Sequence, residues 1–428
     1  MWQADTQNYT EAYSANRRNH AKIIMKIIVL DGNQRPSLAI TRSLGKKGFR
    51  VTIGAETKSS LSSNSCFCAD SFKYPSPHEN PEGFFRAVLD KSRELRPDFL
   101  IPVTDVTIGE VLRRKGEFEE SIRIPYDELE KYSLVSNKEW VVSQCRKLGL
   151  PVPRSVLSTE FPDRKAILDA AEKLGYPLVV KPGFSRIRAE TGWLNTRVQY
   201  ARDEKELDAA LKDPLFSKIP FALQERIRGR GVGIFLLMKD GEVLASFAHR
   251  RLREKPPSGG VSVLCESIEP PADALSAATR LLASVRWNGI AMVEFKEDDR
   301  ENVLNVLEVN ARFWGSLDLA ISSGVNFPYL LLAMRKGEDT RGPAEYKVGL
   351  KVRWELGDLD HLWIRLFRDP TALSLPLGAP SRLSVLTSFI ADSMRLSVQN
   401  EVFCFRDPKP FLYELRQYVQ NAVSPRWR

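Results

Sequence analysis

Two carboxylates and one amide in the third quarter of the chain have the residue types and the spacing of a divalent-cation site. Glu308 and Asn310 lie two residues apart in an apolar run, and alternate side chains of a strand share one face. Glu294 ends the preceding apolar run, and the short polar linker predicts a hairpin that brings it alongside. Hard oxygen donors suit Mg²⁺ that bridges nucleotide phosphates. We therefore predict Glu294, Glu308 and Asn310 as metal ligands; an exposed hairpin face with unrelated charges is the alternative.

Cationic side chains lie where a phosphate would need them. Arg312 can share the face of Asn310 and would neutralise charge on a phosphoryl group in transfer. Lys181 follows a buried apolar run and precedes Pro182-Gly183, so its ammonium can reach a phosphate beside a flexible loop. Lys138 lies near a helix start, where a solvated lysine is the commoner outcome. No GxxxxGK[ST] pattern occurs, so the sequence excludes a P-loop.

Two further segments have the composition of binding loops. Residues Gln224–Ile227 end a predicted strand beside the glycine-rich turn Gly229–Gly233. Backbone groups there can recognise the edge of an adenine, and a plain strand-to-turn junction is the alternative. Residues 249–255 carry four cationic side chains against one acidic side chain, which indicates an anionic partner. Aromatic residues are not interleaved with these charges, so nucleic acid is the less favoured interpretation.

Length and composition exclude several classes of protein. The chain has 428 residues, and 63 Lys and Arg against 54 Asp and Glu give a net charge of +9. At roughly 100–200 residues per domain, two to four domains are expected. The ordinary composition and the lack of an apolar run of roughly 18–20 residues exclude a collagen, a disordered chain and a membrane-spanning protein. Five cysteines form neither a disulfide framework nor a paired CxxC motif, so we expect a reducing cytoplasm.

The N-terminal part of the chain has the order strand, loop, helix, strand. Lys26–Leu30 is a β-branched run, the loop Asp31–Ser37 follows, and a helix to Leu44 leads to a second strand at Val51–Ile53. A later strand is predicted at Phe99–Val103, so this region is a βαβ unit. The loop lacks GxGxxG, so no dinucleotide site is predicted.

The middle of the chain supplies the elements that must position the chemistry. Helices are predicted at 137–148, 164–174, 272–285 and 317–322. Strands are predicted at 176–182, 221–225, 233–239, 242–249, 290–295 and 303–309. From about Gly342 the composition changes to a Trp- and Arg-rich segment.

The order of these segments resembles the ATP-grasp superfamily, and specifically its carboxylate–amine ligase-like members, which include the ATP-binding domain of carbamoyl-phosphate synthase large chains. The resemblance covers about residues 25–335. It rests on these fragments in order: Asn137-Lys138, YPLVVKP around Lys181, LQERIRG around Glu225, HRRLREKPPSGG, AMVEF, LEVNARFWGSL, and SGVNFP at Ser323–Pro328.

The resemblance implies an α/β and α+β chain with the ATP-grasp fold. Residues 1–24 are expected to be a tail that is disordered or foreign to the natural protein, and 25–135 a pre-ATP-grasp βαβ domain. The ATP-grasp domain is then 136–335, with a mobile lid lobe at about 150–222 and a metal-binding lobe at about 223–335. Residues 336–428 are a C-terminal extension without an assigned role.

The resemblance also implies a nucleotide site. Two lysines of such ligases hold the α- and β-phosphates, and Lys138 and Lys181 match them. The hinge strand contacts adenine, and its counterparts here are Glu225, Arg226 and Ile227.

The same resemblance implies the catalytic centre. It assigns Mg²⁺ to Glu294, Glu308 and Asn310, and it gives Arg312 the role of stabilising the transferred phosphate. Arg250 and Arg251 match the region that binds the γ-phosphate or the substrate carboxylate, with Ser258–Gly260 as an adjacent mobile loop. Two departures are the lid loop, which reads GFSRIRAETGW instead of a Gly- and Ser-rich sequence, and Val232 at a position that is often acidic.

The implied activity is an ATP-dependent ligase that activates a carboxylate as an acyl phosphate and couples it to an amine. ATP and Mg²⁺ are the expected cofactors, with two metal ions and Mn²⁺ as a substitute. The expected partners are a small carboxylate and a small amine, in the cytoplasm and without a membrane, and a homodimer stays open. The alternatives are an ATP-grasp carboxylase or carbamoyl-phosphate-type enzyme that uses bicarbonate and, from another class, a noncatalytic module that binds nucleotide or nucleic acid.

Overall fold

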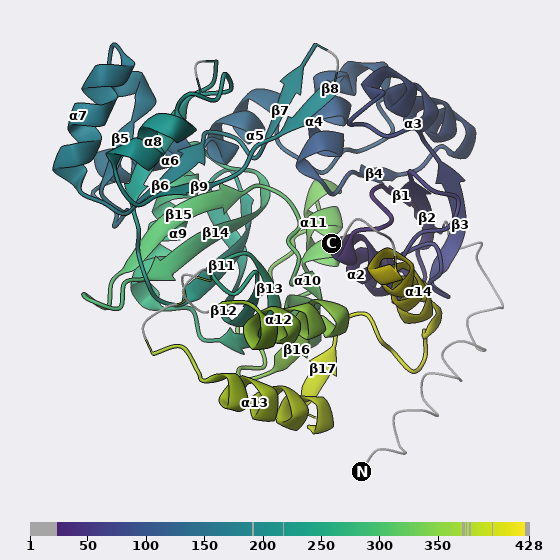
Figure 1. The fold of residues 1–428 in the computed structure, drawn as a ribbon. Coiled ribbons are helices and arrows are strands. Elements are labelled where there is room, and N and C mark those ends of the chain that lie inside the picture. The colour runs from purple at the N-terminus through teal and green to yellow at the C-terminus, as the bar shows by residue number, and fades with distance from the viewer. Residues whose placement is uncertain are drawn as a thin grey trace.

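The computed structural model is a mixed α/β chain whose described residues are 24–423, except 191, 217, 370–372, 374, 376, 377 and 396 (Figure 1). Nearly all of the predicted tail, residues 1–23, lies outside the described residues. The strands of the described part form sheets of four, four, seven and two strands.

The N-terminal domain is built on a parallel sheet with the strand order β3-β2-β1-β4. Its strands are β1 (Lys26–Val29), β2 (Arg50–Ala55), β3 (Cys68–Lys73) and β4 (Phe99–Ile101). Its helices are α2 (Arg35–Lys46), α3 (Pro81–Leu95) and α4 (Asp105–Arg113), with a short 3-10 turn at Lys115–Glu117. Parallel neighbours need crossover connections, which these helices provide. The predicted βαβ unit is therefore confirmed.

A smaller lobe follows, built on an antiparallel sheet with the order β5-β10-β6-β9. Two helices come before this sheet in the chain, α5 (Leu129–Ser136) and α6 (Lys138–Leu148). Its other elements are β5 (Ser155–Leu157), a 3-10 turn (Ser158–Glu160), α7 (Arg164–Leu174), β6 (Leu178–Pro182), β9 (Gln199–Ala201), α8 (Glu204–Ala210) and β10 (Phe221–Glu225). The lobe has a separate apolar core in which Leu178, Val180 and Leu223 are fully buried. Because its core is separate, the predicted lid lobe forms a structural unit of its own.

The lid loop after Lys181 is a hairpin rather than an irregular loop. Its strands are β7 (Arg186–Ala189) and β8 (Gly192–Asn195), which pair only with each other among the described strands. In Figure 1 the hairpin extends from the small lobe towards α4 of the N-terminal domain.

The largest sheet has the order β15-β14-β11-β12-β13-β16-β17. Its strands are β11 (Gly231–Lys239), β12 (Glu242–Lys255), β13 (Val261–Ile268), β14 (Gly289–Glu297), β15 (Leu304–Asn310), β16 (Lys351–Arg353) and β17 (Val398–Asn400). Helices α9 (Ala272–Ala283), α10 (Leu317–Ser323) and α11 (Phe327–Arg335) accompany it. Strand β12 continues to Lys255, beyond the predicted end at His249. Strand β13 was not predicted because polar Ser262, Glu266 and Ser267 interrupt its apolar pattern.

The C-terminal extension is part of this sheet and does not form a separate layer. Strand β16 pairs antiparallel with β13, and β17 pairs parallel with β16. Helices α12 (Glu355–Phe367), α13 (Arg382–Met394) and α14 (Lys409–Val423) complete the extension, and α14 lies close to α2 in Figure 1.

Among the described residues, no single helix has the length and apolar character needed to cross a membrane. Helices α10 and α11 meet those criteria only as a pair, and the pair is bent by 88°.

Candidate functional site

Most of the predicted site residues line one cavity of ≈ 460 Å³ between the small lobe and the largest sheet. The exceptions are Lys138 and Arg250. The predicted residues that line it are Lys181, Glu225, Arg226, Ile227, Arg251, Glu294, Glu308, Asn310 and Arg312.

The predicted hairpin is confirmed, and it brings the three predicted metal ligands together. Strands β14 and β15 pair so that Glu294 and Glu308 lie directly opposite each other, and Asn310 Nδ2 donates to Glu308 Oε1 at 3.1 Å. Burial would raise the pKa of Glu308, but Lys138 and Lys181 outweigh it and lower this pKa to about 2. Glu308 therefore keeps its negative charge throughout the neutral range.

Glu294 is held by an arginine from the neighbouring strand. Burial and the nearby charge of Glu308 raise the pKa of Glu294, while Arg251 opposes this shift. Arg251 Nη2 donates to Glu294 Oε2 at 2.6 Å, and its Nη1 donates to Glu254 Oε1 at 3.0 Å. The guanidinium is thus occupied by two carboxylates in this structure.

The donor set fits Mg²⁺. Two carboxylates and one amide supply hard oxygens on adjacent strands, and such a set leaves room for phosphate oxygens and water around the ion. Within the described chain, no three His, Cys, Asp or Glu residues gather as a metal site.

Lys138 lies next to Glu308. Asn137 caps helix α6 by accepting from Glu139 N at 2.9 Å, which places Lys138 in the first helical turn. A cation there is opposed by the helix dipole, so helix stability does not account for it. Its Nζ lies 3.3 Å from Glu308 Oε2 and donates to Ser185 Oγ at 3.0 Å, and the side chain is 8% exposed. The solvated alternative for Lys138 is therefore wrong.

Lys181 is the next-to-last residue of strand β6 and lines the cavity. Burial lowers the pKa of Lys181 to about 8, and the charge of Lys138 adds to this effect while Glu308 opposes it. An anion such as a phosphate would restore the full charge of this ammonium.

Glu225, the last residue of strand β10, has hydrogen-bond partners for both of its carboxylate oxygens. Glu225 Oε1 accepts from Arg154 N at 2.9 Å, and Oε2 accepts from Arg154 Nε at 3.1 Å. Arg226 packs over the ring of Tyr200 at 5.3 Å, and Ile227 is buried. The side chains around this end form an apolar and aromatic wall against which a planar base can pack.

The two predicted arginines, Arg250 and Arg251, are adjacent residues of strand β12 and lie on its opposite faces. Successive side chains of a strand point to opposite faces, and Arg251 lines the cavity whereas Arg250 does not. Arg250 Nη2 lies 2.7 Å from Glu266 Oε2, and its side chain is 41% exposed. The sequence did not indicate which of the two adjacent arginines would lie on the strand face that meets the cavity. The structure places only Arg251 there.

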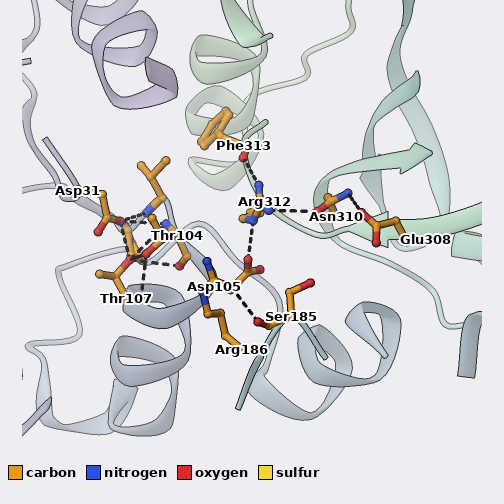
Figure 2. Close-up of polar contacts among 12 residues, drawn as sticks. Asp31, Thr104, Asp105, Thr107, Ser185, Arg186, Glu308, Asn310, Arg312 and Phe313 are labelled. Carbon is orange, nitrogen blue, oxygen red and sulfur yellow. Dashed lines mark hydrogen bonds and ion pairs between the residues drawn. The ribbon is translucent and has the colours of Figure 1, made fainter. Parts of the chain in front are cut away.

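Arg312 receives its orientation from the N-terminal domain (Figure 2). Its Nε lies 2.9 Å from Asp105 Oδ2, and its Nη2 donates to Asn310 Oδ1 at 3.1 Å. Tyr132 donates its hydroxyl to Asp105 Oδ1 at 2.9 Å. Burial would raise the pKa of Asp105, but Arg312 outweighs this and the pKa is lowered. Asp105 was not predicted because a single acidic residue at a helix start carries no long-range signal.

Arg35 is a second residue that sequence reasoning missed, and it lines the cavity. It is the first residue of α2, in the segment that the sequence predicted as a loop, where the only sequence signal was the lack of a dinucleotide fingerprint. His249, also in the cavity lining, is buried and pairs through Nδ1 with Ser316 Oγ at 3.1 Å.

A family model described as ATP-grasp in the biosynthetic pathway with Ter operon matches residues 218–357. The carbamoyl phosphate synthase large chain of Methanothermobacter thermautotrophicus is 25% identical over 259 residues, which is 56% of this chain. The chain spans 23% of the length of that relative.

Solved structures show the same fold. The biotin carboxylase domain of 2-oxoglutarate carboxylase from Hydrogenobacter thermophilus, a dimer solved with MgADP, ADP and bicarbonate, has a TM-score of 0.58 and 14% identity, covering 77% of this chain and 73% of that one. The L-amino acid ligase from Bacillus licheniformis has a TM-score of 0.52 and 19% identity, covering 72% and 73%. Residues 218–357 therefore match an ATP-grasp family model, and the chain has the ATP-grasp fold.

Proposed function

We propose that the chain is an ATP-dependent ligase that converts a carboxylate to an acyl phosphate and then couples it to an amine. The observation that carries this proposal is the cavity wall in which Glu294 and Glu308 oppose each other beside Asn310, with Arg251 and Arg312 next to them. Carboxylates that hold a metal and guanidiniums that meet developing charge are the parts that phosphoryl transfer needs.

The cavity has a wall for each part of the nucleotide. The adenine would pack at Glu225, Arg226 and Ile227, and the α- and β-phosphates would meet Lys138 and Lys181. Support comes from the resemblance in motif order and from the shared cavity, with Lys138 directly behind its wall.

Glu294, Glu308 and Asn310 would hold Mg²⁺, two ions by the resemblance, with Mn²⁺ as a substitute. The metal, when bound, supplies positive charge that offsets the charge of the phosphates. The chain contributes positioning. Asp105 fixes Arg312 and Glu254 fixes Arg251, so both guanidiniums are preorganised.

The proposed reaction has two steps. A carboxylate oxygen attacks the γ-phosphorus of ATP, the bond to the β-phosphate oxygen breaks, and ADP leaves. The amine nitrogen then attacks the acyl carbon, the carbon–oxygen bond to phosphate breaks, and the nitrogen loses a proton to give an amide. Acyl phosphates hydrolyse readily, so the hairpin β7–β8 and the loop Ser258–Gly260 would have to exclude water.

Hydroxylamine provides a test that does not require the natural amine. The full chain is incubated with MgATP, hydroxylamine and a panel of carboxylic acids, one of which carries a heavy-oxygen label in its carboxylate. We expect a hydroxamate, one ADP for each hydroxamate, and label in the released phosphate. ATP cleavage without transfer of label to phosphate would contradict the acyl phosphate.

Glu308→Gln tests the metal assignment within the same assay. Because one carboxylate of the opposed pair is removed, we expect the rate of ADP formation to fall roughly a hundredfold or more, with the fold retained by circular dichroism. Glu301→Gln, in the exposed linker of the same hairpin, is the matched control. Near-normal activity of Glu308→Gln would sink the metal assignment.

A bicarbonate-using enzyme is the second candidate, because the carbamoyl phosphate synthase relative and the bicarbonate-bound biotin carboxylase domain share this fold. ADP formation that depends on bicarbonate and on no other carboxylate would favour it. A dimer, as in that biotin carboxylase domain, stays a prediction for this chain.

A further inference from the structure

Arg35 belongs to the N-terminal domain but lines the cavity of the ATP-grasp domain. It is the first residue of α2, and Pro36 in the same helical turn fixes the backbone there. Its side chain is 12% exposed. Gly315 and Ser316, shortly after Arg312 in the chain, line the cavity with it. The N-terminal domain therefore inserts one guanidinium into the nucleotide-binding domain.

The C-terminal extension holds this guanidinium from behind. Arg35 Cζ lies 4.1 Å from the ring centroid of Trp354, and Arg35 Nη1 donates to Glu401 Oε2. Trp354 is itself fixed, because its Nε1 donates to Glu414 Oε1 at 2.9 Å. An aromatic face and a buried carboxyl thus restrict the side chain of Arg35 to one position.

The other edge of the guanidinium is open. No hydrogen-bond acceptor for Arg35 Nη2 is found in the part of the chain that the structure describes. A Cβ atom at Gly315 would lie 3.0 Å from this nitrogen, so the glycine is what allows the guanidinium to approach the backbone here. The open edge therefore belongs to the cavity surface shared by Arg35 and Gly315.

Arg35 differs in its partners from Arg251 and Arg312, while Arg226 and Arg228 also line the cavity. Arg251 is occupied by Glu294 and Glu254, and Arg312 is occupied by Asp105. Burial raises the pKa of Glu401 to about 8 despite the charge of Arg35, with Asp318 and Glu355 adding to the shift. The raised pKa of Glu401 weakens the compensation that this carboxyl gives to the charge of Arg35 near neutral pH.

We propose that Arg35 binds a carboxylate of the substrate other than the one that is phosphorylated. One guanidinium edge with two donors matches a carboxylate. Within the described chain, no hydrogen bond or ion pair joins Arg35 to Glu294, Glu308 or Asn310, so Arg35 serves a group apart from the metal-binding wall. The inference rests on the proposed function and narrows its substrate class to dicarboxylic or amino acids.

A binding experiment tests this without turnover. The full chain is loaded with Mg²⁺ and a nonhydrolysable ATP analogue and titrated calorimetrically with malonate, succinate, glutarate and L-glutamate, each compared with its monoamide. We expect at least one acid to bind about ten times more tightly than its monoamide. In Arg35→Met this preference should disappear while the ATP analogue binds as before. Arg93→Met, an exposed arginine of α3, is the matched control.

A second pair of variants separates binding from folding. Glu401→Gln keeps the guanidinium and removes its partner's charge, so the preference for the acid should persist or increase. Arg35→Met/Glu401→Gln removes both groups, so no buried charge is left unpaired if Arg35→Met alone fails to fold. Equal binding of every acid and monoamide by the wild-type protein, or an unchanged preference in the folded Arg35 variants, would overturn the inference. Failure of the wild-type protein to bind the ATP analogue would instead count against the proposed function.

Discussion

Arg312 is the middle of a chain of polar contacts that joins two domains. Asp105 of the N-terminal domain contacts its Nε, and Asn310 accepts from its Nη2 and donates to Glu308. A guanidinium fixed at both edges has few alternative rotamers, so its position is set before any substrate binds. Asp105 is therefore a positioning residue for the proposed reaction.

Asp105→Asn should slow ADP formation roughly ten- to a hundredfold with little change in the KM for ATP, because supporting groups of this kind set orientation. The measurement is kcat and KM in the hydroxylamine assay. Asp273→Asn is the matched control, since Asp273 also lies in the first turn of a helix, α9, but is exposed to solvent. A lower melting temperature with an unchanged kcat would show that Asp105 is only structural.

At the scale of elements, the hairpin β7–β8 is docked on α4. Arg188 Nε and Trp193 Nε1 both donate to Glu110 Oε1 at 2.8 Å, and Glu110 is 2% exposed. Gly109 makes the contact feasible, because a Cβ there would lie 2.8 Å from the Trp193 ring. The lid is thus closed onto the N-terminal domain by specific hydrogen bonds.

Trp193→Ala should loosen this lid and admit water to the acyl phosphate. We expect the ratio of amide to ADP to fall several-fold, and faster hydrogen exchange in β7 and β8. Trp363→Ala, at an exposed position of α12, is the control for loss of a tryptophan. An unchanged product ratio together with faster exchange would mean that the docked hairpin does not exclude water.

Elements with a local signal were predictable from the sequence, and contacts between distant segments were not. Alternation placed Glu308 and Asn310 on one face, and a short linker placed Glu294 opposite, so the arrangement of these three side chains followed from local pattern. The face of Arg250 depended on strand β12 continuing beyond His249, which the charged sequence did not reveal. Arg35 joins the cavity through contacts with Trp354 and Glu401, and no sequence pattern encodes such a long-range contact.

At the scale of the whole molecule, the C-terminal extension joins the domains. It adds β16 and β17 to the largest sheet. It also contacts α2 through two ion pairs: Arg42 Nε lies 2.8 Å from Asp407 Oδ2, and Arg35 pairs with Glu401. Part of the positive charge of the chain is thereby used inside the protein rather than on its surface. The extension has a structural role that its sequence alone did not indicate.

This junction makes stability depend on pH. The pKa of Glu401 is raised by burial to about 8 in the folded protein, from an ordinary value of 4.5. Between these two values the unfolded chain has lost the proton that the folded chain retains. The free energy of unfolding should therefore fall as pH rises from 4.5 to 8, by at most about 1.4 kcal/mol per pH unit from this group.

Glu401→Gln should remove that contribution. Chemical denaturation at several pH values should show the variant gaining stability relative to the wild-type protein as pH rises, with the difference levelling off above 8. Glu345→Gln, at a position exposed to solvent, serves as the control for loss of a glutamate. Parallel stability curves for the wild-type protein and Glu401→Gln would contradict the raised pKa.

The contact between Arg35 and Glu401 spans 366 positions of the sequence. At typical translation rates of about 5–20 residues per second, roughly 20–70 seconds pass on the ribosome between the synthesis of the two residues. During that time the emerging N-terminal domain can fold, but its guanidinium has no partner. A nascent chain therefore contains both strands of the β14–β15 hairpin before Glu401 is available to contact Arg35.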